Sequence, residues 1–153
     1  MKFQEFVKAL PEGLVYAPIY AKGTSMLSGK PATGKNPLEA SYEQKFGPAD
    51  VALAIQRNPD LQAVGVFTGI RGNGIVILDV DRNLSKYLHA WGSTLDGAPK
   101  VLSTKTNAAK YLFRVPEELW ADVKGHGLRK EDGGDYEILW GRQGVVCGAY
   151  PGG

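Results

Sequence analysis

Cysteine and histidine are scarce in this sequence, and its apolar runs are short. The single cysteine, Cys147, excludes a disulfide within one chain and any cluster of metal-bound thiolates. Neither His89 nor His126 has a second histidine at metal-ligand spacing, and we expect both to be solvated. Apolar stretches such as residues 75–78 are too short to cross a bilayer, and residues 1–10 lack the apolar segment of a secretory signal. We therefore expect a cytoplasmic protein with no membrane partner.

Neither sign of charge dominates the composition. The sequence has 18 basic and 16 acidic residues and a net charge of +2, which does not by itself indicate a nucleic-acid binder. A hydrophobic fraction of 43% in 153 residues suffices for a folded core, and we expect a single domain over residues 1–153.

Four lysines stand in a segment, residues 21–45, that has only two acidic residues: Lys22, Lys30, Lys35 and Lys45. This segment either meets phosphate groups or forms a solvated loop. Residues 29–36 nearly spell a phosphate-binding loop, but Asn36 replaces the hydroxyl residue that would bind the metal. An ordinary loop is therefore favoured there.

Apolar spacing and turn residues predict an α+β fold with a mixed, largely antiparallel sheet and flanking helices. Helices are expected at 3–10, 48–58 and 84–91, with a shorter helical segment at 117–123. Strands are expected at 14–20, 65–69, 74–81, 108–115, 136–140 and 145–150. Turn residues at 71–74 and 141–144 predict two β-hairpins, and residues 125–134 are expected to form a glycine-rich loop.

The strand at 74–81 ends in two carboxylates that are one residue apart, Asp79 and Asp81. Successive side chains of a strand point to opposite faces, so these two carboxylates point the same way. Like charges held this close repel each other, and a divalent cation relieves the repulsion. The pattern predicts a metal platform; the alternative is a strand that ends in solvent with two acidic residues.

Glu137 is a third acidic candidate, because it is the only charged residue in the apolar run 136–139. The strand at 108–115 has a core face and a basic face, which carries Lys110 and Arg114. Three carboxylates beside basic side chains would suit metal-dependent phosphoryl chemistry. A salt bridge of Glu137 with Lys110, Arg114 or Arg142 is the alternative, and spacing alone does not exclude it.

The order of these motifs resembles the primase-polymerase (prim-pol) domain of the archaeo-eukaryotic primase superfamily. The likeness rests on the glycine-bearing segment 65–69, the strand 74–81 with its two aspartates, the basic strand and the later strand with one acid. It implies an RNA-recognition-like catalytic core at the N-terminus of a longer phage, plasmid or mobile-element replication protein, usually next to a helicase domain. The implied activity is DNA primase/polymerase nucleotidyl transfer, by a monomer that uses a single-stranded DNA template and nucleoside triphosphates.

The resemblance also implies roles for individual residues. The metal ligands for Mg²⁺ or Mn²⁺, in a two-metal site, would be Asp79, Asp81 and Glu137. Lys110 stands where the second motif of the family has a histidine, and it would bind the triphosphate. The other residues expected at nucleotide or template are Arg114, Ser103, Thr104, Lys30 and Lys35.

Two further functions stay open at this point. Because Lys110 replaces the expected histidine, the chain is alternatively a degenerate prim-pol fold that binds nucleic acid or nucleotide without turnover. The residues 78–81 also resemble the aspartyl-nucleophile motif of haloacid-dehalogenase-like phosphatases, although Asn83 stands where that family has threonine or valine.

Overall fold

The computed structural model describes residues 2–127 and 133–149, and it has the α+β composition that the sequence predicts. The described residues form two compact units. Residues 2–67 and 143–149 belong to unit 1, and residues 68–127 and 133–142 belong to unit 2. Among the described residues, no helix has the length and apolar character that crossing a membrane requires.

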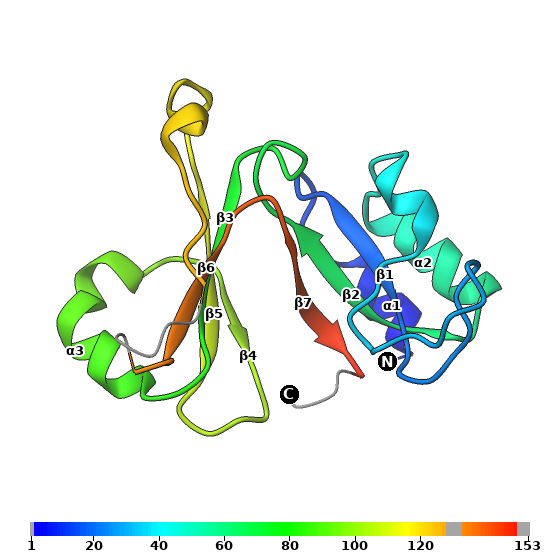
Figure 1. The fold of residues 1–153 in the computed structure, drawn as a ribbon, viewed down its shortest axis with the longest axis horizontal. Helices are drawn as coiled ribbons and strands as arrows, with labels where there is room; N and C mark the ends of the chain where they lie inside the picture. Colours follow the sequence, from blue (N-terminus) through cyan, green and yellow to red (C-terminus); the bar gives the residue numbers. More distant parts are fainter. Residues whose placement is uncertain (1, 128–132, 150–153) are drawn as a thin grey trace. The chain divides into compact units, whose positions relative to one another are not determined.

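Unit 1 is a three-stranded antiparallel sheet with helices packed on it (Figure 1). Its strands are β1 (Tyr16–Tyr20), β2 (Leu61–Phe67) and β7 (Gln143–Gly148), in the order β1-β2-β7. Its helices are α1 (Phe3–Lys8), α2 (Pro48–Arg57) and the 3₁₀ turn η1 (Glu39–Tyr42). Pro48 opens α2 at a position where its missing N–H costs nothing. The expected helices and the strand at 14–20 are thus confirmed in this unit, with slightly shorter bounds.

Unit 2 is a four-stranded antiparallel sheet, and it carries the acidic residues singled out in the sequence. The strands are β3 (Ile75–Val80), β4 (Lys100–Leu102), β5 (Ala109–Arg114) and β6 (Tyr136–Leu139), in the order β4-β5-β3-β6. Helix α3 (Leu84–Leu95) follows β3, and the 3₁₀ turn η2 (Glu117–Asp122) follows β5.

The core of unit 2 lies between α3 and one face of the sheet, which Figure 1 shows side by side. The buried residues of this core are Val80, Leu84, Tyr87, Leu95, Ala109 and Tyr111. Side chains alternate along β3 and β5, so the residues between these core positions point to the opposite face. The predicted division of β5 into a core face and a basic face is confirmed. On α3, Tyr87 lies on the buried side, whereas Leu88 is 40% exposed.

The predicted hairpin at 141–144 is wrong, and the one at 71–74 is limited to a single antiparallel bridge between Gly69 and Ile75. The strand before the turn at 71–74 is β2, which pairs with β1 and β7, while β3 after the turn pairs with β5 and β6. The turn at 141–144 likewise leads from β6 in one sheet to β7 in the other. The single mixed sheet is therefore replaced by two sheets in which every pairing of the described strands is antiparallel.

Turn chemistry explains why the local signal misled. Gly69 and Gly141 both have positive φ, which permits a sharp change of direction whether or not the flanking strands pair. Here the two connections bind each other: the Thr68 N–H donates to the Arg142 carbonyl at 2.8 Å, and the Arg142 N–H donates to Thr68 Oγ1 at 3.1 Å. A Cβ on Gly69 would lie 2.6 Å from the main-chain nitrogen of Gly141, so this approach requires glycine.

Two expectations concern the segment before β6. His126, expected to be solvated, is half-buried and stacks on Tyr136 with ring centroids 5.4 Å apart. Of the loop expected at 125–134, residues 128–132 lie outside the described residues. Cys147 is a half-buried residue of β7.

Candidate metal centre

The strand register of unit 2 places the three predicted carboxylates together. Asp79 in β3 pairs with Lys110 of β5 on one side and with Glu137 of β6 on the other. Directly paired residues of neighbouring strands point to the same face, and Asp81, two residues beyond Asp79, points there too. The convergence predicted from three separate motifs is therefore confirmed.

The three side chains are close enough to share one cation. One carboxylate oxygen from each of Asp79, Asp81 and Glu137 lies within 4.8 Å of the others. Asp79 is buried, with 9% of its surface exposed, and the other two are half-buried. A set made only of carboxylate oxygens suits hard divalent cations such as Mg²⁺, Mn²⁺ or Ca²⁺, rather than metals that prefer thiolate or imidazole.

The electrostatics of the cluster favour the arrival of positive charge. Burial raises the pKa of Asp79, and the neighbouring Asp81 charge raises it further, against the opposing effect of Lys110. Burial also raises the pKa of Glu137, with a further contribution from Asp79 and Asp81. In both cases the folded protein penalises the ionised carboxylate, and a bound divalent cation would remove that penalty.

Two lysines form ion pairs with the aspartates. Lys110 Nζ lies 3.1 Å from Asp79 Oδ2, and both side chains are largely buried. Lys105 Nζ lies 3.2 Å from Asp81 Oδ1, and its own side chain is 45% exposed. Lys110 was expected at this site. Lys105 was not, because only the pairing of β5 with β3 brings the turn between β4 and β5 beside the end of β3.

The remaining predicted residues lie elsewhere or play local roles. Arg114 is four residues along β5 from Lys110, roughly 13 Å away at strand spacing, and donates to the Asn73 carbonyl. Ser103 accepts a hydrogen bond from the Lys105 N–H at 3.0 Å, and Thr104 is exposed in the same turn. Lys30 and Lys35 belong to unit 1, where both are exposed.

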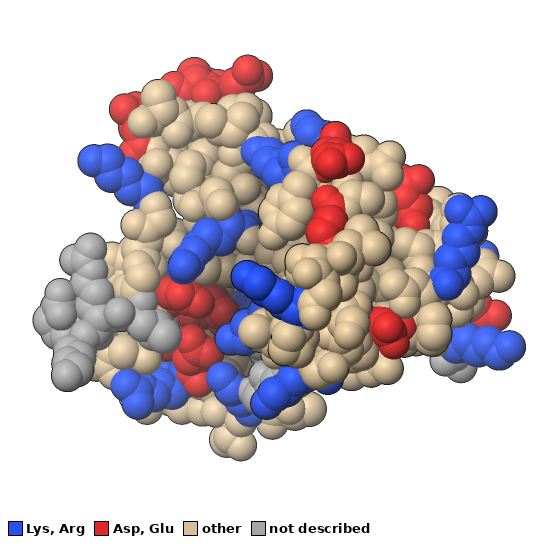
Figure 2. All heavy atoms as spheres, turned by 45° about the vertical axis from the view of Figure 1, so that its right-hand side comes forward, with Lys and Arg blue, Asp and Glu red and all other residues tan. Residues whose placement is uncertain are grey.

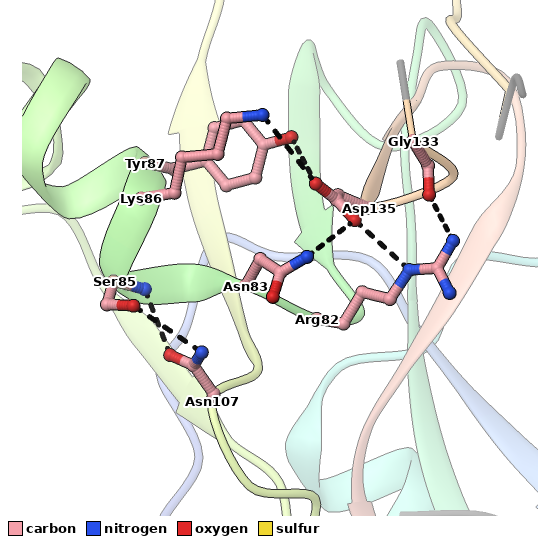
Figure 3. A network of polar contacts seen from close by, with 8 residues as sticks. All are labelled: Arg82, Asn83, Ser85, Lys86, Tyr87, Asn107, Gly133 and Asp135. Atoms are coloured by element: carbon pink, nitrogen blue, oxygen red, sulfur yellow. Dashed lines mark hydrogen bonds and ion pairs between the residues drawn. The ribbon is translucent and has the colours of Figure 1, made fainter. Parts of the chain in front are cut away.

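Sequence reasoning missed Asp135, which immediately precedes β6. This carboxylate is only 3% exposed and accepts hydrogen bonds from side chains at the start of α3 (Figure 3). Its main-chain carbonyl accepts the Asp81 N–H at 2.8 Å. An acidic residue after the glycines at 133 and 134 reads as part of a solvated turn, so no local signal identified it.

Comparison with protein-family models, with curated proteins and with solved structures gives no match. The candidate centre is thus defined by its own geometry.

Charged side chains of both signs lie on the surface of the described residues. On the face of the molecule drawn in Figure 2, acidic and basic atoms are interspersed rather than sorted into one large basic area.

Proposed function

We propose that this protein is a metal-dependent nucleotidyltransferase that synthesises DNA on a single-stranded template. The observation that carries the proposal is the convergence of three strand-borne carboxylates within 4.8 Å, with lysines on two of them. The order of the motifs, which resembles that of prim-pol domains, supplies the choice of nucleotidyl transfer among metal-dependent reactions.

In this reaction a primer or initiating hydroxyl attacks the α-phosphorus of a nucleoside triphosphate, and pyrophosphate leaves. When bound, Mg²⁺ or Mn²⁺ would lower the pKa of the attacking hydroxyl and neutralise charge on the phosphates. Asp79, Asp81 and Glu137 would hold and orient the ion from three positions that the sheet fixes.

The two lysines would change partners when the site is loaded. With all side chains ionised, three carboxylates and two ammonium groups carry a net charge of −1. A divalent cation on the same oxygens would repel Lys105 and Lys110, because like charges about 4 Å apart interact strongly even at an effective dielectric of about 20. The released ammonium groups would then stand beside the ion, where they can pair with triphosphate oxygens.

Incorporation of labelled nucleotides into primed and unprimed single-stranded DNA, with Mn²⁺, tests the proposal. Losing a metal ligand removes several kcal/mol of transition-state stabilisation, so Asp79→Asn and Asp81→Asn should each lower the rate about 100-fold or more. Asp96→Asn, a change at an exposed aspartate of the same unit, is the matched control and should retain the wild-type rate. Activity that survives at Asp79→Asn would contradict the metal assignment, and phosphate release without incorporation would favour a phosphatase.

A second candidate is a nucleotide- or nucleic-acid-binding module without turnover. The close pairing of Lys110 with Asp79 favours it, because the lysine already neutralises the most buried of the three clustered carboxylates. This candidate predicts no incorporation by the wild-type protein, together with single-stranded DNA binding that Asp79→Asn leaves unchanged.

A further inference from the structure

Asp135 is a buried charged residue with no assigned role in the chemistry above. Its carboxylate accepts hydrogen bonds from Tyr87 Oη at 2.9 Å, Arg82 Nε at 3.0 Å and Asn83 Nδ2 at 3.1 Å. Lys86 Nζ lies 3.9 Å from its second oxygen. Figure 3 shows these donors, from residues 82–83 before α3 and from Lys86 and Tyr87 within it, directed at this one carboxylate.

The donors lie within the turn that follows Asp81 and in the first residues of α3. Asn83 has a φ of 58°, a left-handed conformation that asparagine adopts more readily than most residues other than glycine. Arg82 also donates to the Gly133 carbonyl, so it spans from the turn to the segment before β6. The side-chain contacts of Asp135 therefore hold this left-handed turn in place.

The main chain of Asp135 also binds the turn that follows Asp81, and so connects that turn to the candidate metal centre. Its carbonyl accepts the Asp81 N–H at 2.8 Å and the Arg82 N–H at 3.3 Å. Glu137 lies two residues further along and is paired with Asp79. One residue thus connects the backbone at Asp81 with the strand that carries Glu137.

Metal binding is sensitive to such links, because ligand atoms must be held within about 0.5 Å of their working positions. We propose that Asp135 is a positioning residue: its carboxylate clamps the turn at 81–83 against the start of β6 and so sets how Asp81 and Glu137 face each other. This role rests on the metal centre of the proposed function, but it does not depend on which reaction that centre serves.

The test is the Mn²⁺ affinity of the full chain, measured from the electron paramagnetic resonance signal of free Mn²⁺. Asp135→Asn keeps the size of the side chain and removes the charge that gathers the donors. Loss of a partner that orients metal ligands typically weakens binding about 10- to 100-fold, and we expect a change in this range.

A matched control separates positioning from general stability. Leu95→Ala opens a cavity in the same core at the opposite end of α3, roughly 16 Å along the helix from the turn. Measured well below the melting temperature, Leu95→Ala should bind Mn²⁺ like the wild type. If Asp135→Asn also binds like the wild type, the positioning role is refuted.

Asn83→Gly covers the case in which Asp135→Asn fails to fold. Glycine accepts the positive φ at this position, so the fold should be kept, while one donor to Asp135 is lost. We expect the variant to stay folded and to bind Mn²⁺ several-fold more weakly; wild-type affinity in this variant would overturn the proposal.

The outcomes also separate this inference from the proposed function. If the wild type binds Mn²⁺ and both variants weaken it, the positioning role stands even when no nucleotide is incorporated, and only nucleotidyl transfer fails. If the wild type does not bind Mn²⁺ at millimolar concentration, the positioning role falls with the metal centre.

Discussion

Replacing Glu137 by glutamine should stabilise the ion-free protein and abolish its stabilisation by metal. Burial and the charges of Asp79 and Asp81 hold the pKa of Glu137 above its ordinary value. A carboxylic acid whose pKa is higher in the folded state ionises more readily in the unfolded chain, so its contribution to stability is lost as the pH rises through the folded pKa. At pH 7 the ionised glutamate is therefore a cost, and neutral glutamine of similar shape removes it.

The size of this effect follows from the geometry. Two carboxylate charges 4.8 Å apart repel by about 3.5 kcal/mol at an effective dielectric of about 20. Lys110 and Arg142 attract Glu137, and solvent screens a half-buried group, so the net gain is smaller. We expect about 1 kcal/mol, which raises the melting temperature by roughly 2–4 °C in a chain of this length.

Mn²⁺ should reverse the order of the two proteins. An ion at 100 times its dissociation constant stabilises the wild type by about 2.7 kcal/mol, or several degrees of melting temperature. Glu137→Gln lacks one of the three ligands and should gain much less. Scanning calorimetry in EDTA and in Mn²⁺ measures both effects, with the exposed Glu117→Gln as the matched control.

A Glu137→Gln protein that melts at or below the wild-type temperature in EDTA, and that gains as much from Mn²⁺ as the wild type does, would refute this prediction. That result would mean that the acidic cluster neither repels itself nor binds the ion.

Two further outcomes are expected. Lys105→Met should tighten Mn²⁺ binding up to about fivefold, because an exposed ion pair that competes for Asp81 contributes at most about 1 kcal/mol. Lys100→Met, at a lysine that lies over the Tyr111 ring, is the control and should leave the Mn²⁺ affinity unchanged. Weaker Mn²⁺ binding by Lys105→Met would contradict the proposed release of this lysine from Asp81. The hydrogen bonds from Tyr87, Asn83 and Arg82 lower the pKa of Asp135. The ionised Asp135 therefore stabilises the fold above its unfolded pKa of about 4, and this stabilisation is lost as the pH falls through the lower folded pKa. The urea midpoints of the wild type and of Asp135→Asn should differ at pH 7 and move closer together at pH 3.

Much of the local structure could be predicted from the sequence because its cause is local. The expected helices at 3–10, 48–58 and 84–91 correspond to α1, α2 and α3, since apolar spacing and proline positions act within a few residues. Period-two alternation likewise placed Asp79 and Asp81 on one face, and it placed Lys110 opposite the core face of β5. Each of these statements follows from the geometry of a single helix or strand.

Strand pairing could not be predicted from the sequence, because the residues at a turn do not specify which distant strand pairs with the strands on either side of it. The turns at 71–74 and 141–144 have hairpin chemistry, yet both lead from one sheet to the other. Their strands instead find partners far along the chain, as β3 does with β5 and β6.

The same distinction between local pattern and strand pairing applies to the candidate metal centre. The sequence by itself determined that Asp79 and Asp81 share a face and that Glu137 is a lone acid in an apolar strand. Only the tertiary structure decided that Glu137 and Lys110 flank Asp79. It also decided that Lys105 forms an ion pair with Asp81 and that Asp135 binds the turn at residues 81–83. The physical reason is that these contacts depend on the register between strands. That register arises from packing across the whole unit, and the amino-acid types at the contacting positions do not encode it locally.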